Sequence, residues 1–270
     1  MRRRLTIAAV LTTAVAVTSV ATGQPAGQRQ TIEAAVAAKT RTPANVERDR
    51  YRHPVDTLAF FGVKPGDTVV EFSPGNGWYT EILAPLVKGK GRYIALVSPR
   101  GVEGATKLID GRRAEFGPGA SVATLDGTTG TSTVPAGSAD VVLTFRNVHN
   151  LLMSSDTAVP GRTFAAFFAA LKPGGVLGVV DHRLPEEMDT TKEKTSGYIK
   201  RSTVVKLAQA AGFELAGESA INANPRDDHD HPQGVWTLPP TYRLGDQDRA
   251  TYAAIGESDR MTLKFRKPKR

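Results

Sequence analysis

Hydrophobic and polar residues follow one another along the chain in blocks that predict strands and helices. The clearest block begins with TVVEF at 68–72, where apolar residues flank a single acid, as in a buried strand. A turn of sequence SPGNG follows, and the apolar spacing then becomes helical as far as Val87. We therefore predict a strand, a tight glycine turn and a helix over residues 68–87.

The same alternation continues beyond this unit. We predict further strands at 92–97, 121–125, 140–145, 176–181 and 213–220, with helices at 104–116, 164–171 and 202–211. Regular alternation of strands and helices is typical of an α/β protein, in which a mostly parallel sheet carries helices on both faces. The core of this fold is expected over residues 63–220.

The segments on either side of this core have a different composition. Residues 24–62 predict a polar linker and a helical cap, because a charged run leads into an apolar helix that ends at Gly62. Residues 221–270 predict a C-terminal extension whose Pro and Asp content excludes a helix at 222–232. Strands are predicted in it at 235–238 and 261–265, the second as a final antiparallel edge strand.

The glycine turn after the first predicted strand has the properties of a ligand-binding site. Gly75 and Gly77 permit positive φ and have no Cβ, so a ligand can approach their backbone. The helix that follows directs free N–H groups to the same place. Glu71, at the end of the strand, can accept hydrogen bonds from hydroxyl or amino groups of the ligand. A structural turn without a ligand is the alternative for this stretch alone.

This stretch and two later ones resemble a known family. Acid-x-Ser-Pro-Gly-x-Gly at 71–77 resembles motif I of the class I S-adenosylmethionine (SAM) dependent methyltransferases, with Ser73 in place of the first glycine. ADVVLTFRNVHN at 139–150 resembles motif IV, and LKPGGVLGVVD at 171–181 resembles the motif after it. The resemblance implies a Rossmann-like class I methyltransferase fold, whose mostly parallel seven-stranded sheet has an antiparallel edge strand. It also implies SAM as cofactor and a small molecule as methyl acceptor.

The resemblance further assigns residues to the cofactor. The second predicted strand ends in Ser98, where the family has an acid for the ribose hydroxyls, so ribose binding is expected to be weaker or shared. Asp126 stands where the family places a contact to the adenine amino group. The cofactor-binding residues implied in this way are Glu71, Ser73, Gly75, Gly77, Ser98, Asp126 and Arg146.

Polar residues follow the fourth and fifth predicted strands, at the ends where open α/β sheets bind ligands. The two strands are neighbours in the resembled fold, so we expect four candidate catalytic residues to converge on one cavity: Asn147, His149, Asp181 and His182. Methyl transfer needs alignment and often a base, and histidine titrates near neutrality. His149 or His182 is the candidate base, and Asp181 orients His182 or holds the substrate. Hydrogen bonds that fix the loops are the alternative role.

The same side chains offer ligands for a metal. His149, Asp181, His182 and the DDHDH run at 227–231 provide imidazoles and carboxylates. Their spacing matches no recognised metal motif, and we predict no metal site. The chain has no cysteine, which excludes disulfides, lipoprotein anchoring and thiolate-bound zinc.

The first 23 residues have the pattern of a cleaved signal peptide. Three arginines precede an apolar run from Leu5 to Ala21, with small residues near its end. We predict an exported, periplasmic bacterial protein with no transmembrane span after cleavage; an uncleaved anchor is the alternative. Lys and Arg number 35 against 27 Asp and Glu, but no basic patch interleaved with aromatic residues indicates nucleic acid.

Two functions follow from these patterns. The stretches RNVHN, NPRDDHDHPQGVWTLPP and GESDRMTLKF resemble a bacterial group of predicted, often exported, methyltransferase-like proteins. The expected function is SAM-dependent methyl transfer to a small molecule. Export argues against it, because SAM is made in the cytoplasm. The alternative is an exported protein that binds a small ligand or a metal and keeps the fold without SAM, and the missing acid at Ser98 favours it.

Overall fold

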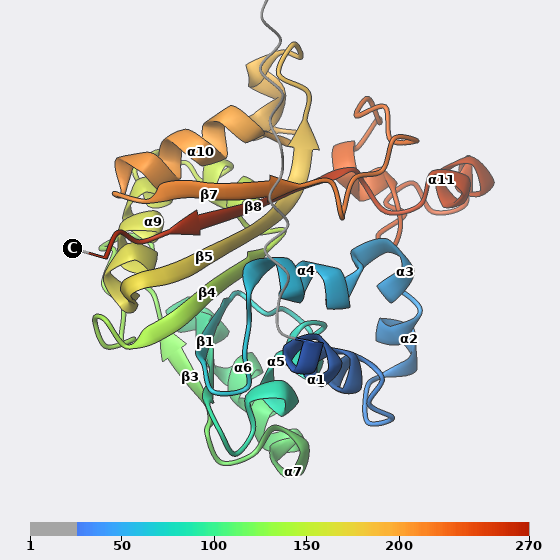
Figure 1. The fold of residues 1–270 in the computed structure, drawn as a ribbon. Coiled ribbons are helices and arrows are strands. Elements are labelled where there is room, and N and C mark those ends of the chain that lie inside the picture. The colour runs from blue at the N-terminus through green and yellow to red at the C-terminus, as the bar shows by residue number, and fades with distance from the viewer. Residues whose placement is uncertain (1–25, 270) are drawn as a thin grey trace, which may run out of the picture.

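A central sheet with helices on both faces organises the chain (Figure 1). The computed structural model describes residues 26–269, so the predicted signal peptide at 1–23 lies outside the described residues. The strands lie in the order β3-β2-β1-β4-β5-β8-β7. Their bounds are β1 (Thr68–Phe72), β2 (Arg92–Val97), β3 (Ala120–Thr124), β4 (Ala139–Phe145), β5 (Leu171–Leu184), β7 (Glu214–Ser219) and β8 (Arg260–Arg266). The predicted α/β fold with a mostly parallel sheet is confirmed.

The antiparallel strand has a different place from the predicted one. β8 is antiparallel, as expected, but it lies between β5 and β7 and pairs with both, so β7 forms the edge. Leu263 and Phe265 of β8 are buried, as is typical of an interior strand. In the described part of the chain, a two-residue strand, β6 (Ile199–Lys200), pairs with the end of β5 and makes the sheet eight-stranded.

The prediction of a strand at 235–238 is wrong. This segment is a 3₁₀ helix, η3 (Gly234–Thr237). Its first residue, Gly234, has a positive φ of 55°, and Pro239 and Pro240 follow shortly after the helix. Since proline has no backbone N–H and restricts its neighbour, the segment cannot continue as a paired strand.

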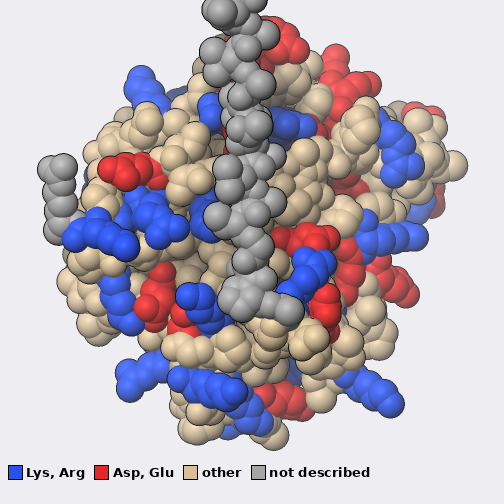
Figure 2. Space-filling model, in the orientation of Figure 1, with Lys and Arg blue, Asp and Glu red and all other residues tan. Residues whose placement is uncertain are grey.

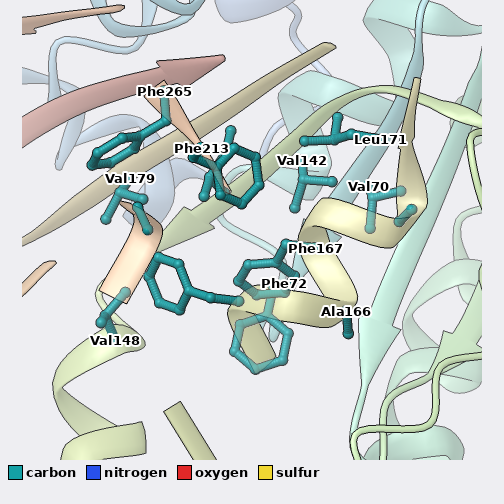
Figure 3. Packing of buried hydrophobic residues seen from close by; sticks show 14 of the residues in the cluster. Val70, Phe72, Val142, Val148, Ala166, Phe167, Leu171, Val179, Phe213 and Phe265 are labelled. Carbon is teal, nitrogen blue, oxygen red and sulfur yellow. The ribbon is translucent and has the colours of Figure 1, made fainter. Parts of the chain in front are cut away.

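Each face of the sheet has its own group of helices and its own hydrophobic core. One group comprises α1 (Ala26–Val36), α4 (Pro54–Phe61), α5 (Thr80–Val87), α6 (Val102–Gly111) and α7 (Arg113–Phe116). The other comprises α8 (Val148–Leu152), α9 (Val159–Ala170) and α10 (Arg201–Ala210). Figure 3 shows the second core, in which Phe72 of β1 packs edge-on against Phe167 of α9 with ring centroids 5.1 Å apart.

The two cores determine where β1 places its acid. Successive side chains of a strand point to opposite faces. Val70 and Phe72 therefore enter the core beside α9, whereas Val69 enters the core beside α5. Glu71 has the same parity as Val69, so its side chain is buried beneath α5 rather than free at the strand end.

The N-terminal cap and the C-terminal extension meet beyond the carboxyl ends of the strands. Figure 1 shows α3 (Asp49–Arg52) and α11 (Arg249–Ile255) on the same side of the sheet, with α2 (Pro43–Val46) next to α3. Arg48 Nε lies 2.6 Å from Glu257 Oε1, and Arg260 donates to the carbonyl of Tyr51 at 2.9 Å. The two extensions therefore hold each other over the ends of β1, β4 and β5. Two short 3₁₀ helices complete the elements: η1 (Pro99–Gly101) and η2 (Thr190–Lys194).

The charges on the surface are mixed. On the face seen in Figure 2, Lys and Arg side chains lie among Asp and Glu side chains. Of the helices between residues 26 and 269, none combines the length and the apolar character needed to cross a membrane.

Candidate active site

Two neighbouring cavities lie at the carboxyl ends of β1, β4 and β5. The first encloses about 230 Å³ between the N-terminal cap, the glycine turn and the end of β4, and Gly75 lies on its wall. The second encloses about 220 Å³ between α8, the end of β5 and the C-terminal extension, and both His149 and His182 line it. Arg146 lines both cavities, so it stands at their boundary.

The glycine turn has the predicted backbone, and its two glycines differ in their surroundings. Ser73, Gly75 and Gly77 all have positive φ, at 51°, 58° and 82°. A Cβ on Gly77 would lie 2.8 Å from Leu108 Cδ2, so Gly77 permits close packing of α6 on the turn. A Cβ on Gly75 would meet no heavy atom within 4 Å. The space beside Gly75 is therefore open to a ligand.

Glu71 accepts hydrogen bonds from other side chains of the protein, whereas the sequence predicted a ligand as its partner. Its Oε2 accepts hydrogen bonds from Tyr93 Oη at 2.6 Å and from Thr80 Oγ1 at 2.9 Å. Burial raises the pKa of Glu71 from its ordinary 4.5 to about 7, although both hydrogen bonds lower it. Glu71 therefore links β1, β2 and α5 and also borders the first cavity.

Asp181 orients His149 rather than His182. Its Oδ1 lies 2.7 Å from His149 Nδ1, and its Oδ2 accepts from the backbone N–H of Val148 at 2.7 Å and of His149 at 3.2 Å. The backbone N–H of His182 donates to Oδ1 at 2.8 Å. Asp181 is fully buried and thus fixes the start of α8 and the ring of His149 together. An Nδ1–H donated to the carboxylate leaves Nε2 of His149 as a proton acceptor.

His182 is buried next to His149 but has another partner. Its Nδ1 is hydrogen-bonded to Ser258 Oγ, and the two imidazole rings are 4.9 Å apart between centroids. Burial lowers the pKa of His182 well below its ordinary 6.5, and His149, Arg146, Arg260 and Arg52 lower it further. His182 is therefore neutral near pH 7.

Asn147 fixes the backbone between two strands. Its side-chain amide donates to the carbonyls of Phe72 at 3.0 Å and Phe145 at 3.1 Å, which join the ends of β1 and β4. It lines the first cavity, whereas His149 and His182 line the second. The predicted cluster is thus brought to one edge of the sheet, but its members do not share one cavity, and Asp181 is buried behind the second cavity without lining it.

The remaining cofactor candidates lie outside both cavities, with one exception. Ser98 is exposed at the end of β2, and Asp126 is half-buried after β3, where its Oδ1 accepts from Thr128 N at 2.8 Å. Neither lines the first or the second cavity. The exception is Ser73, which lines the first cavity.

A cluster of four arginines, two buried and two half-buried, borders the two cavities, and the sequence did not predict it. Glu257 Oε1 lies 2.6 Å from Arg48 Nε, and Glu257 Oε2 lies 3.3 Å from Arg52 Nε and 3.1 Å from Arg260 Nη1. Burial raises the pKa of Glu257, but these arginines and Arg146 outweigh it and lower the pKa to about 2. Burial also lowers the pKa of Arg146 to about 10. The charged run at 47–52 was the only sign of this cluster in the sequence.

The Asp and His run of the C-terminal extension binds itself and the core. Asp227 accepts from Tyr198 Oη at 2.9 Å and lies 2.8 Å from His231 Nε2, while His229 Nε2 lies 3.1 Å from Asp259. None of the residues from Asp227 to His231 lines the two cavities. Their described contacts are those of a structural network that holds the extension in place.

In the described part of the chain, two groups of side chains bring potential metal ligands close together. The potential ligand atoms lie within 4.8 Å of one another in each group. The groups are His149, Asp181 and His182, and Asp227, Asp228 and His231.

Comparison with known proteins finds solved structures that share the fold of this chain. No protein-family model and no curated protein matches the chain. A SAM-dependent methyltransferase from Aquifex aeolicus is similar in structure, with 19% identity, a TM-score of 0.52, and coverage of 72% of this chain and 93% of its own. A putative sarcosine dimethylglycine methyltransferase from Galdieria sulphuraria shows 12% identity, a TM-score of 0.54, and coverage of 83% and 85%.

A third similar structure has a different activity. The [4+2]-cyclase SpnF shows 15% identity and a TM-score of 0.56, and the match covers 85% of each chain. At these identities the likenesses show the fold alone. The chain has the fold of the SAM-dependent methyltransferases, and its site has to be interpreted from its own residues.

Proposed function

We propose that this protein transfers the methyl group of SAM to a small-molecule acceptor. The observation that carries the proposal is the first cavity, which borders the open side of Gly75 and adjoins a second cavity with an oriented histidine. A glycine turn between a buried strand and a helix, with free space above it, fits a ligand whose chain lies against the backbone. We assign SAM to Glu71, Ser73, Gly75 and Gly77 at its methionine end, and its adenosine end extends beyond the first cavity to Ser98 and Asp126. Arg146, at the boundary of the two cavities, lies between SAM and the acceptor.

In this proposal the chain's residues align the acceptor and remove its proton. SAM supplies an electrophilic methyl group when it is bound. His149 Nε2 accepts the proton of the acceptor's nucleophile, and Asp181 holds the ring and stabilises its charged form. Asn147 keeps the ends of β1 and β4 in register, so that the two cavities stay in line. His182, which is neutral, completes the wall of the second cavity.

Calorimetry of the chain without residues 1–23 tests the cofactor assignment. SAM and S-adenosylhomocysteine should bind, and Gly75→Val should abolish binding because the new side chain fills the open space beside the turn. Gly137→Val is the matched control, since Gly137 also has positive φ (64°) and free space around its Cβ position but lies before β4. Equal SAM affinity in wild type and Gly75→Val would refute the assignment of the turn.

Turnover measurements test the base. His149→Asn should lower turnover about 10²–10⁴-fold while SAM binding is retained. His53→Asn is the control, because His53 lies outside both cavities. Release of a stoichiometric metal from His149→Asn, with recovery of stability in excess ion, would instead identify a metal ligand.

A second candidate function is an exported protein that binds a small ligand and keeps the fold without SAM. The exposed Ser98, in place of an acid at the end of β2, favours it, because a carboxylate for the ribose hydroxyls is missing there. The existence of a cyclase with this fold agrees with it. Calorimetry decides between the two functions, since the second requires that neither SAM nor S-adenosylhomocysteine binds.

A further inference from the structure

Positive charge exceeds negative charge where the two cavities meet. Arg48, Arg52 and Arg260 share a single carboxylate, that of Glu257. Burial lowers the pKa of Arg52, and the charge of the neighbouring Arg146 lowers it further. Arg52, Arg260 and Glu257 are each no more than 4% exposed, whereas Arg48 and Arg146 are half-buried. Because a buried charge without a partner is costly, this excess points to a missing anion.

The acid nearest to the cluster does not remove the excess. Asp181 also attracts Arg146, but its two oxygens already accept from three backbone N–H groups and adjoin His149 Nδ1. Asp181 and Glu257 together supply two negative charges against the four arginines. Two positive charges are therefore left without a carboxylate from the protein.

Unused donors show where the anion would bind. Arg48 Nη2 and Arg52 Nη2 are buried without a hydrogen-bond partner, and both residues line the first cavity. Between residues 26 and 269, no group accepts a hydrogen bond from the Arg146 guanidinium. Arg146 has a positive φ of 62°, which is uncommon outside glycine, and its backbone N–H is held by Val180 O at 2.7 Å. This backbone conformation directs a guanidinium to the boundary of both cavities.

We propose that the methyl acceptor is an anion, a small molecule with a carboxylate or phosphate group that Arg146 binds at the boundary of the cavities. Guanidinium groups match both oxyanions in geometry and bind them bidentately. That this anion is the methyl acceptor rests on the proposed function, whereas the anion site itself does not depend on it.

The charge of other ligands makes them poor substitutes for this anion. SAM carries a sulfonium and an ammonium group against one carboxylate, so it adds positive charge to the cluster. A metal cation on His149, Asp181 and His182 would face the same arginines that lower the pKa of His182. The electrostatics of the second cavity therefore favour an oxyanion over a metal.

The residues on the opposite wall of the second cavity indicate what the rest of the acceptor is. Val235, Trp236, Pro239 and Pro240 line it together with Thr241. The Trp236 ring lies 6.3 Å from the His149 ring between centroids. An aromatic or aliphatic body would pack on this wall, with its nucleophile near His149 and its anionic group at Arg146.

Calorimetry at low salt and without SAM tests the site. The probes are benzoate, phenyl phosphate and inorganic phosphate, with benzamide as the neutral counterpart of benzoate. We expect at least one oxyanion to bind, and benzamide to bind at least about tenfold more weakly than benzoate. Arg146→Gln should weaken the binding of the oxyanions about 10–100-fold and leave benzamide unchanged, whereas Arg146→Lys should retain part of the affinity. Arg92→Gln, an exposed site at the start of β2, loses the same charge and should bind like wild type.

Each result has a definite meaning. The absence of binding of all three oxyanions to folded wild type, equal affinity for benzoate and benzamide, or unchanged affinity in Arg146→Gln would overturn the proposal. A rise in melting temperature with phosphate in wild type and Arg92→Gln, but not in a folded Arg146→Gln, would support it independently. A preference for benzoate over phenyl phosphate, or the reverse, identifies the kind of oxyanion. SAM is titrated separately, so anion binding without SAM binding would refute only the proposed function.

Discussion

Replacement of Glu71 by glutamine should stabilise the protein at pH values above the window from 4.5 to about 7, and should have little effect below it. The carboxylate is buried, and burial raises its pKa from 4.5 to about 7. Between these two values the folded state retains a proton that the unfolded state has lost. The free energy of unfolding must therefore fall as the pH rises through this window, by about 1.4 kcal/mol per pH unit and about 3 kcal/mol in total. Glutamine has the same shape, keeps an oxygen for Tyr93 and Thr80, and does not titrate.

Urea unfolding at pH 4.5 and pH 8 measures this effect. Glu71→Gln and wild type should have similar free energies of unfolding at the lower pH, and the variant should exceed wild type by about 2–3 kcal/mol at the higher pH. Other groups that titrate, such as His182, affect both proteins alike and cancel in the difference. Glu103→Gln is the control, because Glu103 is exposed and its ion pair with Lys107 lies at the surface, so the same substitution there should change the free energy of unfolding little. A difference between Glu71→Gln and wild type that stays constant from pH 4.5 to pH 8 would refute the reasoning.

Three further predictions concern the site and the N-terminus. Asp181→Asn should lower the free energy of unfolding by about 2–5 kcal/mol, because one acceptor oxygen becomes a donor that faces other donors; a loss no larger than that of Glu103→Gln in urea would contradict it. Glu257→Gln should cost about 3–5 kcal/mol at pH 7 by the same assay, because three arginines lose their carboxylate. Glu257 has its pKa lowered to about 2, so this loss should shrink as the pH falls from 4.5 towards 2, and a loss independent of pH would be evidence against the cluster. Intact-mass analysis from the native host should find residues 1–23 removed, and a soluble cytoplasmic form that retains Met1 would disprove export.

Local features of this fold could be predicted from the sequence. The unit from Thr68 to Val87 is defined by apolar spacing and by glycine within one short stretch, and its structure agrees with the prediction. That His149 and His182 lie near each other could also be predicted, because they follow or end two parallel strands whose carboxyl ends meet at one edge of the sheet. These inferences need only neighbours in the sequence and the direction of the chain.

Features that depend on distant pairing could not be predicted in this way. The order of β5, β8 and β7 is decided by side chains from three separate segments, so an antiparallel strand could be foreseen but its place could not. The arginine cluster joins Arg48 to Glu257, which are 209 positions apart. Asp181 has its partner in His149 instead of the adjacent His182, because the backbone N–H groups of α8 fix its carboxylate.

The interior position of β8 also sets an order of events during synthesis. Among the strands of the described chain, β7 pairs with β8 alone, and β5 shares its outer edge with β8 along seven residue pairs. Until residues 260–266 leave the ribosome, the outer edge of β5 has no partner there and β7 has nothing to pair with. A growing chain that completes its sheet only with a late segment stays unfolded for longer. During this delay the edge of β5 stays open to pairing with other strands.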